Sequence, residues 1–491
     1  MPGPLIEGKM LIDGQLVESQ GGAWLDTINP ATEEVIGRVP MGTAADMEQA
    51  VEAAERAQVK WADTSMADRI KMIRTLSEAI EARGDEIAKI EVMDTGNTIK
   101  PMRKDVTKAV ERMNFYAGIA YEMKGDTVPS TPGNIHMTMR VPYGVVGRII
   151  PFNHPIGFAA SRLAPALIAG NAIIIKPSEQ SPLSACILGE LCAEHLPPGI
   201  VNIVTGGRET GEALVRHPRV KRIAFIGSVA SGMAIQKAAA ETAVKHVTLE
   251  LGGKNPMIVF PDAGNLQTVA KVAVAAMNFG WQGQSCGSMS RLFLHDDIHD
   301  EVVDGVLEAV KAIKVGDPLD GANTMGPINS AAQYEKVMSY IKLGQDEGAK
   351  LVLGGKRPEG KQFEKGNWVE PTVFTGVKQS MRIANEEIFG PVMSIMRWSD
   401  TDEMVRDANA VDYGLTASIW SEDYRTALGM VQRINAGYIW VNGAGPHYRG
   451  LPYGGFKNSG TGREEGIEEL LSYTEVKAVS LLLDEKSAFR K

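Results

Sequence analysis

Cys286 is the residue best suited to act as a nucleophile. It lies in NFGWQGQSCGS, where Gly283 and Gly287 allow the backbone to bend closely around the thiol. Such a turn could direct the Cys286 N–H toward a substrate oxygen, as acyl transfer requires. A buried structural cysteine explains this segment equally well, because buried cysteines are common. Cys186 and Cys192 lie among leucines on an apolar helical run and are expected in the core.

Two polar residues at the ends of apolar runs could assist such a nucleophile. Glu250, in HVTLELGGKNP, could activate water to hydrolyse a thioester, or it could simply pair with Lys254. Asn153, in RIIPFNHPIGF, could donate its side-chain amide to an oxyanion, or it could only shape the turn. His154 is the weaker candidate for a base, since its neighbour Asn153 already gives this turn a function.

Two segments have the character of a nucleotide-binding site. The run Ile173–Glu179 is typical of a strand that ends at Lys176, and the Lys176 ammonium and the Glu179 carboxylate could hold a ribose between them. The run Phe225–Gly232 is typical of a strand, a Gly-Ser turn and a helix start, where backbone N–H groups and Ser228 suit a pyrophosphate. This turn lacks G-x-G-x-x-G, so the usual dinucleotide fingerprint is missing.

Alternating strands and helices are expected to position these residues. Residues 44–117 have helical periodicity, with Ser65 and Asp68 as a capping pair. Strands are expected at Val145–Ile150, Ala172–Ile175, Val201–Val204, Arg222–Ile226, Val247–Leu249, Met257–Phe260, Val392–Met396, Ser418–Trp420, Tyr438–Val441 and Glu475–Leu483. Helices are expected at Ser181–His195, Glu209–Val215, Ser231–Thr242 and Leu266–Phe279. Such alternation predicts parallel sheets covered by helices, in two α/β lobes.

Composition and charge exclude several classes of protein. The 491 residues suit two or three packed domains, and 44% hydrophobic with 23% charged residues is an ordinary globular balance. Lys and Arg total 51 and Asp and Glu total 60, so the net charge of −9 argues against nucleic-acid or membrane binding. A count of three cysteines argues against a disulfide framework. We expect a cytoplasmic protein, because the sequence has neither a recognisable signal peptide nor an apolar run long enough to cross a membrane. No metal site is expected.

The motifs together resemble the aldehyde dehydrogenase superfamily over nearly the whole chain. They occur in the family's order, as PFN (Pro151–Asn153), IIKPSE (Ile174–Glu179), FIGS (Phe225–Ser228), LELGGKNP (Leu249–Pro256), GQSC (Gly283–Cys286), EEIFGPV (Glu386–Val392) and LPYGGFKNSGTGRE (Leu451–Glu464). No single motif is decisive, but seven in register make a chance match very improbable.

The resemblance implies a role for each motif residue. Cys286 would be the nucleophile, Glu250 the general base and Asn153 the side-chain oxyanion donor. The implied cofactor contacts are Ile149, Pro151, Phe152, Lys176, Ser178, Glu179, Gly227, Ser228, Gly232, Leu251, Glu387 and Phe389. The substrate pocket is expected to include Ile156, Gly157, Trp281, Ser285 and His447.

The implied fold is α/β, with a Rossmann-type cofactor domain, an α/β catalytic domain and a small β oligomerisation extension. On this basis residues 1–120 and 143–251 form the NAD-binding domain and residues 252–450 the catalytic domain. Residues 121–142 and 451–491 form oligomerisation or bridging segments. Members of the family work as dimers or tetramers, so a homo-oligomer is expected.

The implied reaction is the NAD-dependent oxidation of a small-molecule aldehyde to a carboxylic acid, through a thiohemiacetal and a thioester on Cys286. Glu179 near the ribose 2′-hydroxyl would repel a 2′-phosphate, which favours NAD over NADP. A CoA-acylating semialdehyde dehydrogenase, which would not need Glu250, remains an alternative, as does a non-catalytic structural member of the fold. A cysteine hydrolase is a third alternative, although no histidine partner is indicated. The substrate stays open: Trp281 could line an apolar pocket, whereas His447 or Arg449 could hold the carboxylate of a semialdehyde.

Overall fold

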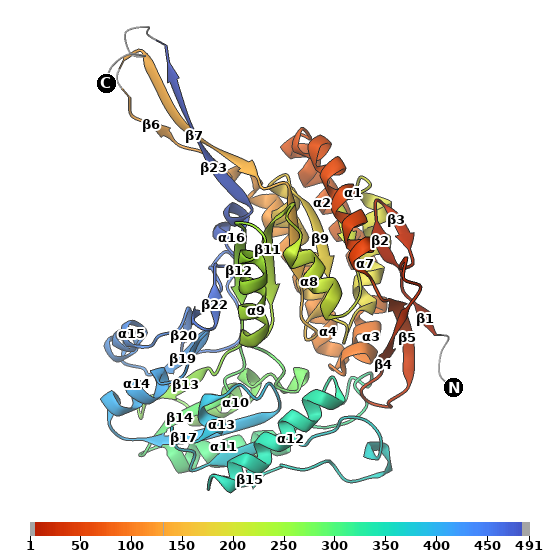
Figure 1. Cartoon of the computed structure of the whole chain (residues 1–491). Coiled ribbons are helices and arrows are strands. Elements are labelled where there is room, and N and C mark those ends of the chain that lie inside the picture. Colours follow the sequence, from red (N-terminus) through yellow and green to blue (C-terminus); the bar gives the residue numbers. More distant parts are fainter. Residues whose placement is uncertain (1–4, 131, 484–491) are drawn as a thin grey trace.

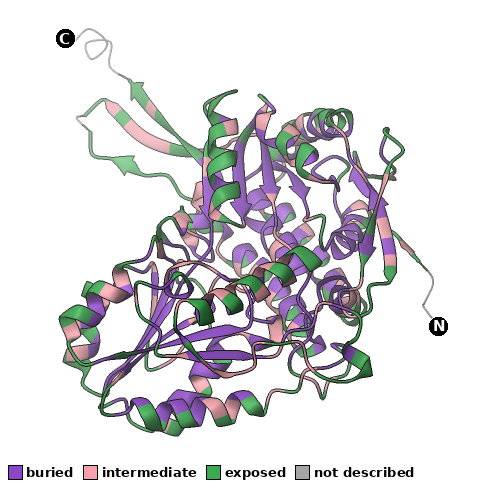
Figure 2. Ribbon diagram, turned by 60° about the horizontal axis from the view of Figure 1, so that its bottom comes forward, coloured by how far each residue is buried: buried purple, intermediate pink, exposed green. Residues whose placement is uncertain are grey.

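The computed structural model describes residues 5–130 and 132–483. Two sheets with mostly parallel strands form the body of the molecule, and a narrow β extension projects from it (Figure 1). The strands of both sheets are largely buried, whereas the extension is exposed along most of its length (Figure 2). These observations confirm the α/β class and the two lobes predicted from the alternating pattern.

The first sheet has eight strands in the order β22-β12-β11-β8-β9-β10-β2-β3. Their bounds are β22 Gly460–Thr461, β12 His246–Glu250, β11 Val220–Ile226, β8 Val145–Ile149, β9 Ala172–Lys176, β10 Val201–Ile203, β2 Met10–Ile12 and β3 Gln15–Val17. The five central strands, β12 to β10, run parallel, and β9 is buried at every position. Burial on both faces explains why these strands are continuous apolar runs in the sequence.

Nine helices belong to this first lobe within the described residues. They are α1 Ala44–Ala62, α2 Met66–Ala82, α3 Gly84–Thr95, α4 Ile99–Gly118, α5 Pro155–Ser161, α6 Leu163–Ile168, α7 Leu183–His195, α8 Arg208–Arg216 and α9 Val229–Ala240. Helices α1, α8 and α9 pack side by side, and α2 to α7 pack against one another. Ser65 caps α2 as predicted, since its hydroxyl accepts a hydrogen bond from the Asp68 N–H at 3.2 Å.

The second sheet has seven strands in the order β15-β16-β17-β14-β13-β19-β20. Their bounds are β15 Lys350–Leu353, β16 Thr372–Thr375, β17 Val392–Trp398, β14 Arg291–His295, β13 Pro256–Val259, β19 Thr416–Trp420 and β20 Tyr438–Val441. The accompanying helices are α10 Leu266–Ala276, α11 His299–Lys311, α12 Ala331–Asp346, α13 Arg382–Asn385, α14 Thr401–Asn409 and α15 Tyr424–Arg433. The helix predicted to reach Phe279 ends at Ala276, because Asn278 adopts a left-handed conformation with φ 56°.

The extension is built from β6 (Thr127–Val128), β7 (Asn134–Pro142) and β23 (Thr474–Leu482). Strand β23 pairs antiparallel with β7 along its whole length, and its other edge has no strand partner among the described residues. The terminal strand predicted at Glu475–Leu483 is therefore present, displaced by one residue. Residues 451–473 link this extension to the body, because they contribute β22 to the first sheet and helix α16 (Ile467–Ser472), which packs on α6.

Smaller elements complete the chain. Strands β1 (Ile6–Glu7), β5 (Val35–Pro40) and β4 (Trp24–Ile28) form a three-stranded sheet, and β18 (Tyr413–Gly414) pairs with β21 (Phe456–Lys457). Short 3-10 helices lie at η1 Ala120–Glu122, η2 Phe279–Trp281 and η3 Lys361–Phe363. Within the part of the chain that the structure describes, no helix is both long enough and apolar enough to cross a membrane.

Candidate active site

Cys286 lies where two cavities meet. The first, which we name the aromatic cavity, holds about 890 Å³ of empty space, part of it open to solvent. It is lined by Asp105, Lys108, Arg112, His154, Gly157, Phe158, Arg162, Ile226, Glu250, Asn278, Trp281, Ser285, Cys286, Gly287, Trp440, Gly445, His447, Tyr453, Glu464 and Glu465. The second, the central cavity, is lined by Pro151, Phe152, Asn153, Ile226, Gly227, Ser228, Glu250, Leu251, Gly252, Cys286, Gln333, Lys336, Glu387 and Phe389. Cys286, Glu250 and Ile226 are common to both walls, so a molecule in either cavity can reach the thiol.

The turn that carries Cys286 follows η2 and is held tightly by the second lobe. Gly283 has φ +67°, and a Cβ there would lie 2.2 Å from the Gly390 carbonyl oxygen, so only glycine fits. The Asn255 side-chain amide donates to the Cys286 carbonyl at 2.7 Å. The Cys286 Sγ lies 3.9 Å from the Tyr453 hydroxyl. Burial, followed by the charge of Glu387, raises the pKa of the thiol to about 12, so the thiol is protonated at neutral pH in this state.

Asn153 follows β8 and lies on the wall of the central cavity beside Cys286. Its Nδ2 donates to the Gln284 carbonyl oxygen at 2.9 Å, and its own carbonyl oxygen accepts from Asn97 Nδ2 at 2.9 Å. These two bonds fix both the backbone and the amide plane of Asn153. A side-chain amide has two N–H donors, and the second one has no partner among the described residues, so it could donate to a molecule in the central cavity.

Glu250 is the last residue of β12 and is 6% exposed. Its pKa is raised well above the usual value, first by burial and then by the negative charge of Glu464. Its Oε2 has no hydrogen-bond partner among the described residues. The alternative pairing of Glu250 with Lys254 does not occur, since the buried Lys254 Nζ is itself without a hydrogen-bond partner there. A buried carboxyl group with a raised pKa is suited to accept a proton from water or from a thiol.

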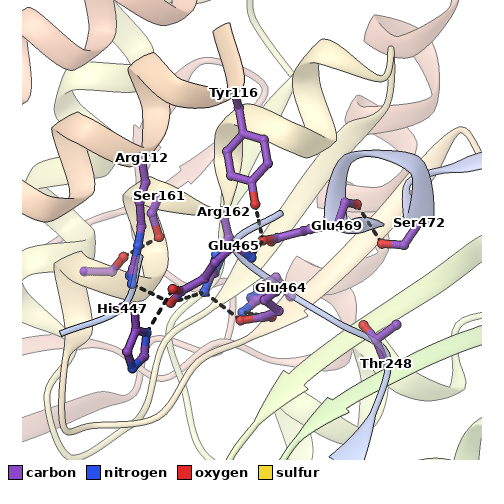
Figure 3. Close-up of polar contacts among 12 residues, drawn as sticks. Arg112, Tyr116, Ser161, Arg162, Thr248, His447, Glu464, Glu465, Glu469 and Ser472 are labelled. Carbon is purple, nitrogen blue, oxygen red and sulfur yellow. Dashed lines mark hydrogen bonds and ion pairs between the residues drawn. The ribbon is translucent and has the colours of Figure 1, made fainter. Parts of the chain in front are cut away.

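A cluster of buried charges, which we name the ionic cluster, acts on Glu250 electrostatically. Figure 3 shows Arg162, Glu464 and Glu469 of this cluster. Arg162 contacts Glu464 at 2.7 Å and Glu469 at 2.8 Å, and Arg148 contacts Glu464 at 2.7 Å. Tyr116 donates its hydroxyl to the same oxygen of Glu469. Burial opposes ionisation of Glu464, but the two guanidinium groups outweigh it and lower the pKa of Glu464. Glu464 is therefore a carboxylate, and its negative charge adds to the rise in the pKa of Glu250.

Next to the ionic cluster, Glu465 connects α4 with the segment that carries His447, which lines the aromatic cavity. It forms an ion pair with Arg112 and contacts His447 Nδ1 at 2.9 Å (Figure 3). The His447 ring stacks on the Tyr453 ring, with the centroids 4.3 Å apart. This chain of contacts fixes one aromatic wall within reach of the Cys286 thiol.

A third hollow, the distal cavity, extends along the carboxyl end of β9 and the start of α9. It is lined by Ile149, Lys176, Glu179, Gly207, Arg208, Gly211, Glu212, Val215, Arg216, Ala230, Ser231, Ala234, Ile235, Lys237, Ala238 and Glu241. Lys176 Nζ contacts Glu179 Oε2 at 3.0 Å at its rim. Ser228 caps α9, its hydroxyl accepting from the Ser231 N–H at 3.2 Å. This helix N-terminus, between the distal and central cavities, is a favourable position for phosphate oxygens.

Glu387 occupies a cradle of two glycines at the wall of the central cavity. The Gly253 N–H donates to Glu387 Oε1 at 3.0 Å. A Cβ at Gly252 would lie 2.2 Å from Glu387 Oε2, so a larger residue would displace the carboxylate. The Phe152 and Phe389 rings meet edge to face beside it, with the centroids 5.8 Å apart. The distal and central cavities thus have a polar group at each end and a helix N-terminus between them, an arrangement that could hold a dinucleotide.

Comparison with known proteins decides the family. The model of the aldehyde dehydrogenase family matches residues 16–479. The chain belongs to the aldehyde dehydrogenase family. The resemblance seen in the sequence is thereby confirmed, together with the reaction class, the oxidation of an aldehyde with a nicotinamide cofactor.

Individual relatives agree with this assignment. The aldehyde dehydrogenase tropH of Talaromyces stipitatus is 44% identical over 93% of this chain and 90% of its own length. The putative aldehyde dehydrogenase DhaS of Bacillus subtilis is 42% identical over 97% of this chain and 96% of its own. The structure of an aldehyde dehydrogenase from Bacillus cereus in complex with NAD+ superposes with a TM-score of 0.94 and 38% identity, covering 97% of both chains.

Most residues predicted from the sequence lie on the cavities of this aldehyde dehydrogenase. Four do not. Ile156 is fully buried in the core of the first lobe, where its N–H donates to Glu91. Ser178 lines neither nucleotide-side cavity. Gly232 is a packing position, since a Cβ there would lie 2.8 Å from the Leu251 side chain. Arg449 does not line the aromatic cavity and pairs with Glu111 at 2.8 Å.

Other residues of the site were missed by sequence reasoning. The acidic and basic residues are Asp105, Lys108, Arg112, Arg162, Lys336 and Glu465. Asp105, Lys108 and Arg112 are spaced three and four apart within a helix, so they share one face. That spacing is a usable signal, but nothing local says that the face borders Cys286. No group of three or more His, Cys, Asp or Glu suited to a metal ion occurs within the described ranges.

Proposed function

We propose that the enzyme oxidises an aldehyde to a carboxylic acid with NAD, through a thioester on Cys286 that is hydrolysed with the help of Glu250. The observation that carries this proposal is the shared wall of the two cavities. An aldehyde in the aromatic cavity and a dinucleotide in the central cavity would meet at Cys286 and Glu250. Among the described residues, Glu250 is the only carboxyl group that lines both cavities.

The first step uses groups that the fold already holds in place. The Cys286 thiol releases its proton to solvent, and the thiolate attacks the aldehyde carbon. The oxyanion that forms accepts hydrogen bonds from the free Asn153 amide N–H and from the Cys286 backbone N–H. Donors that are fixed before the reaction stabilise the developing charge without reorganisation. The bonds from Asn153 to Gln284 and from Asn97 to Asn153 supply this fixed geometry.

A nicotinamide cofactor, when bound, accepts the hydride that leaves the tetrahedral adduct. The thioester then remains on Cys286. Glu250 next removes a proton from a water molecule, which attacks the thioester carbon and releases the carboxylic acid. The raised pKa of Glu250 makes its carboxylate a stronger base for this step.

The residues of the distal and central cavities fit NAD. Lys176 and Glu179 can hold the adenosine ribose, the α9 N-terminus at Ser228 the pyrophosphate, and Glu387 the second ribose. The Glu179 carboxylate would repel a 2′-phosphate, so we expect a higher kcat/KM with NAD than with NADP. Equal or better use of NADP would refute this preference and point to Arg208, which lines the same cavity.

We also propose that the chain self-associates through the extension. Among the residues that the structure describes, one edge of strand β23 is unpaired over nine residues, and Val476, Leu481 and Leu482 on it are exposed. Exposed edges with apolar side chains commonly pair with another strand. A dimer or tetramer formed in this way would bury these apolar side chains.

We expect a cytoplasmic location. The three cysteines are all free thiols, which fits the reducing cytoplasm.

The assignment of Glu250 is tested by rapid mixing of Glu250→Gln with aldehyde and NAD. We expect a burst of reduced cofactor equal to the enzyme concentration, followed by turnover about a hundredfold slower than in the native enzyme. Cys286→Ala should give no burst, and the exposed Glu301→Gln should behave as the native enzyme does. Full steady-state turnover by Glu250→Gln would refute its role as the base. If added CoA restored turnover as a CoA thioester, the acylating alternative would replace hydrolysis.

A further inference from the structure

One face of helix α4 borders the aromatic cavity and carries three charged side chains. Asp105, Lys108 and Arg112 follow at steps of three and four and all line the cavity. Asp105 is the most deeply buried of the three, whereas Lys108 and Arg112 are partly exposed. The cavity therefore has charged groups beside its aromatic walls.

The carboxylates near this face are already engaged by other groups. Asp105 Oδ2 contacts His154 Nδ1 at 2.7 Å and accepts from Trp281 Nε1 at 3.3 Å. Glu465 pairs with Arg112 through one oxygen and contacts His447 through the other at 2.9 Å. Arg112 and both carboxylates are thus satisfied without Lys108.

Lys108 has no hydrogen bond and no ion pair with any described residue. Lys108 is half-buried, and this burial lowers its pKa although the charges of Asp105 and Glu465 oppose the shift. Its ammonium group lines the cavity without a partner among the described residues and is therefore placed to contact an anion bound there.

We propose that the Lys108 ammonium binds a carboxylate at the far end of the aldehyde, so that the substrate class is the carboxyaldehydes, or semialdehydes. This inference rests on the proposed function, because it assigns the other end of the same substrate to Cys286. Phe158, Trp281 and Trp440 line the cavity and would pack against the carbon chain between the two ends. The two residues first considered for this role are committed elsewhere, Arg449 to Glu111 and His447 to Glu465.

Straight-chain aldehydes of equal length that end in a carboxylate, a methyl group or an ammonium test the proposal in steady-state kinetics with NAD. The native enzyme should have the highest kcat/KM for the carboxylate. Lys108→Met should raise KM for the carboxylate about ten- to a hundredfold, the range of a charge-assisted hydrogen bond, with little change in kcat. The methyl-ended aldehyde should be oxidised as well as before, and Lys108→Arg should restore much of the lost affinity.

Lys104→Met is the matched control, because Lys104 is an exposed lysine on the same helix that does not line the cavity. It should leave all three substrates unchanged. Equal losses for the carboxylate- and methyl-ended aldehydes in Lys108→Met would overturn the proposal in favour of a structural role. A native preference for the ammonium-ended aldehyde would overturn it in favour of recognition by Asp105 and Glu465. A failure to oxidise any of the three aldehydes would instead count against the proposed function.

Discussion

Replacing Arg162 with methionine should strongly destabilise the protein. Arg162 is 1% exposed and lies within 3 Å of two carboxylates, Glu464 and Glu469, which it ties to the first lobe. Methionine fills a similar volume but leaves a buried negative charge without its main partner. Removing one partner of a buried ion pair costs about 3–5 kcal/mol, and we expect a loss of this size because Arg148 and Tyr116 can only partly replace the guanidinium.

Urea unfolding followed by tryptophan fluorescence, at one fixed protein concentration, measures this loss. The control is Arg449→Met, which breaks an ion pair to Glu111 of similar length on the surface, where each partner is about half exposed. Exposed pairs contribute about 0–1 kcal/mol. The double variant Arg162→Met with Glu469→Leu should recover part of the stability, because one buried charge is removed with its partner. A loss for Arg162→Met no larger than that of Arg449→Met would refute the reasoning.

The remaining predictions concern the base and the cofactor cradle. Glu464→Gln removes the negative charge that, after burial, raises the pKa of Glu250, so the acid limb of the kcat–pH profile should shift to lower pH. An unchanged or raised acid limb would contradict this coupling. Gly252→Ala should raise the KM for NAD about tenfold, or about 1.4 kcal/mol, because its Cβ would displace the Glu387 carboxylate. Gly429→Ala is the control, since a Cβ there meets nothing within 4 Å, and equal KM values for the two variants would exclude the displacement.

The sequence was sufficient for the elements of the first sheet because their signal is local. The strands that end at Ile149 and Lys176 are apolar runs buried on both faces, and each is followed by turn residues. The end of α10 was predicted at Phe279 instead of Ala276, because the sequence signal that ends this helix is weak. Asn278 adopts a left-handed conformation that asparagine tolerates, yet the surrounding residues continue the apolar helical pattern.

The motif residues could be named in advance because each lies at a strand end or in a glycine turn, where the composition is unusual. Glu387 could not have been placed on geometry alone. Its cradle depends on Gly252 and Gly253, which lie more than a hundred residues earlier in the chain. The resemblance to a family supplied this contact, and physical reasoning from spacing did not.

The charged residues of the aromatic cavity were not predictable, because their environment comes from distant segments. Arg162 follows α5, yet its partner Glu464 lies between β22 and α16, and its partner Glu469 lies in α16. On sequence alone Lys108 is one of several lysines on an amphipathic helix, and the ordinary expectation is a solvated charge. Lys108 differs from Lys104 because it lines the cavity next to carboxylates that already have partners. Those partners are His154, Trp281 and Arg112. The contacts form only when α4 has packed against distant segments of the chain. The proposed specificity of this enzyme therefore rests on a charge without a partner among the described residues, and this is visible only in the assembled cavity.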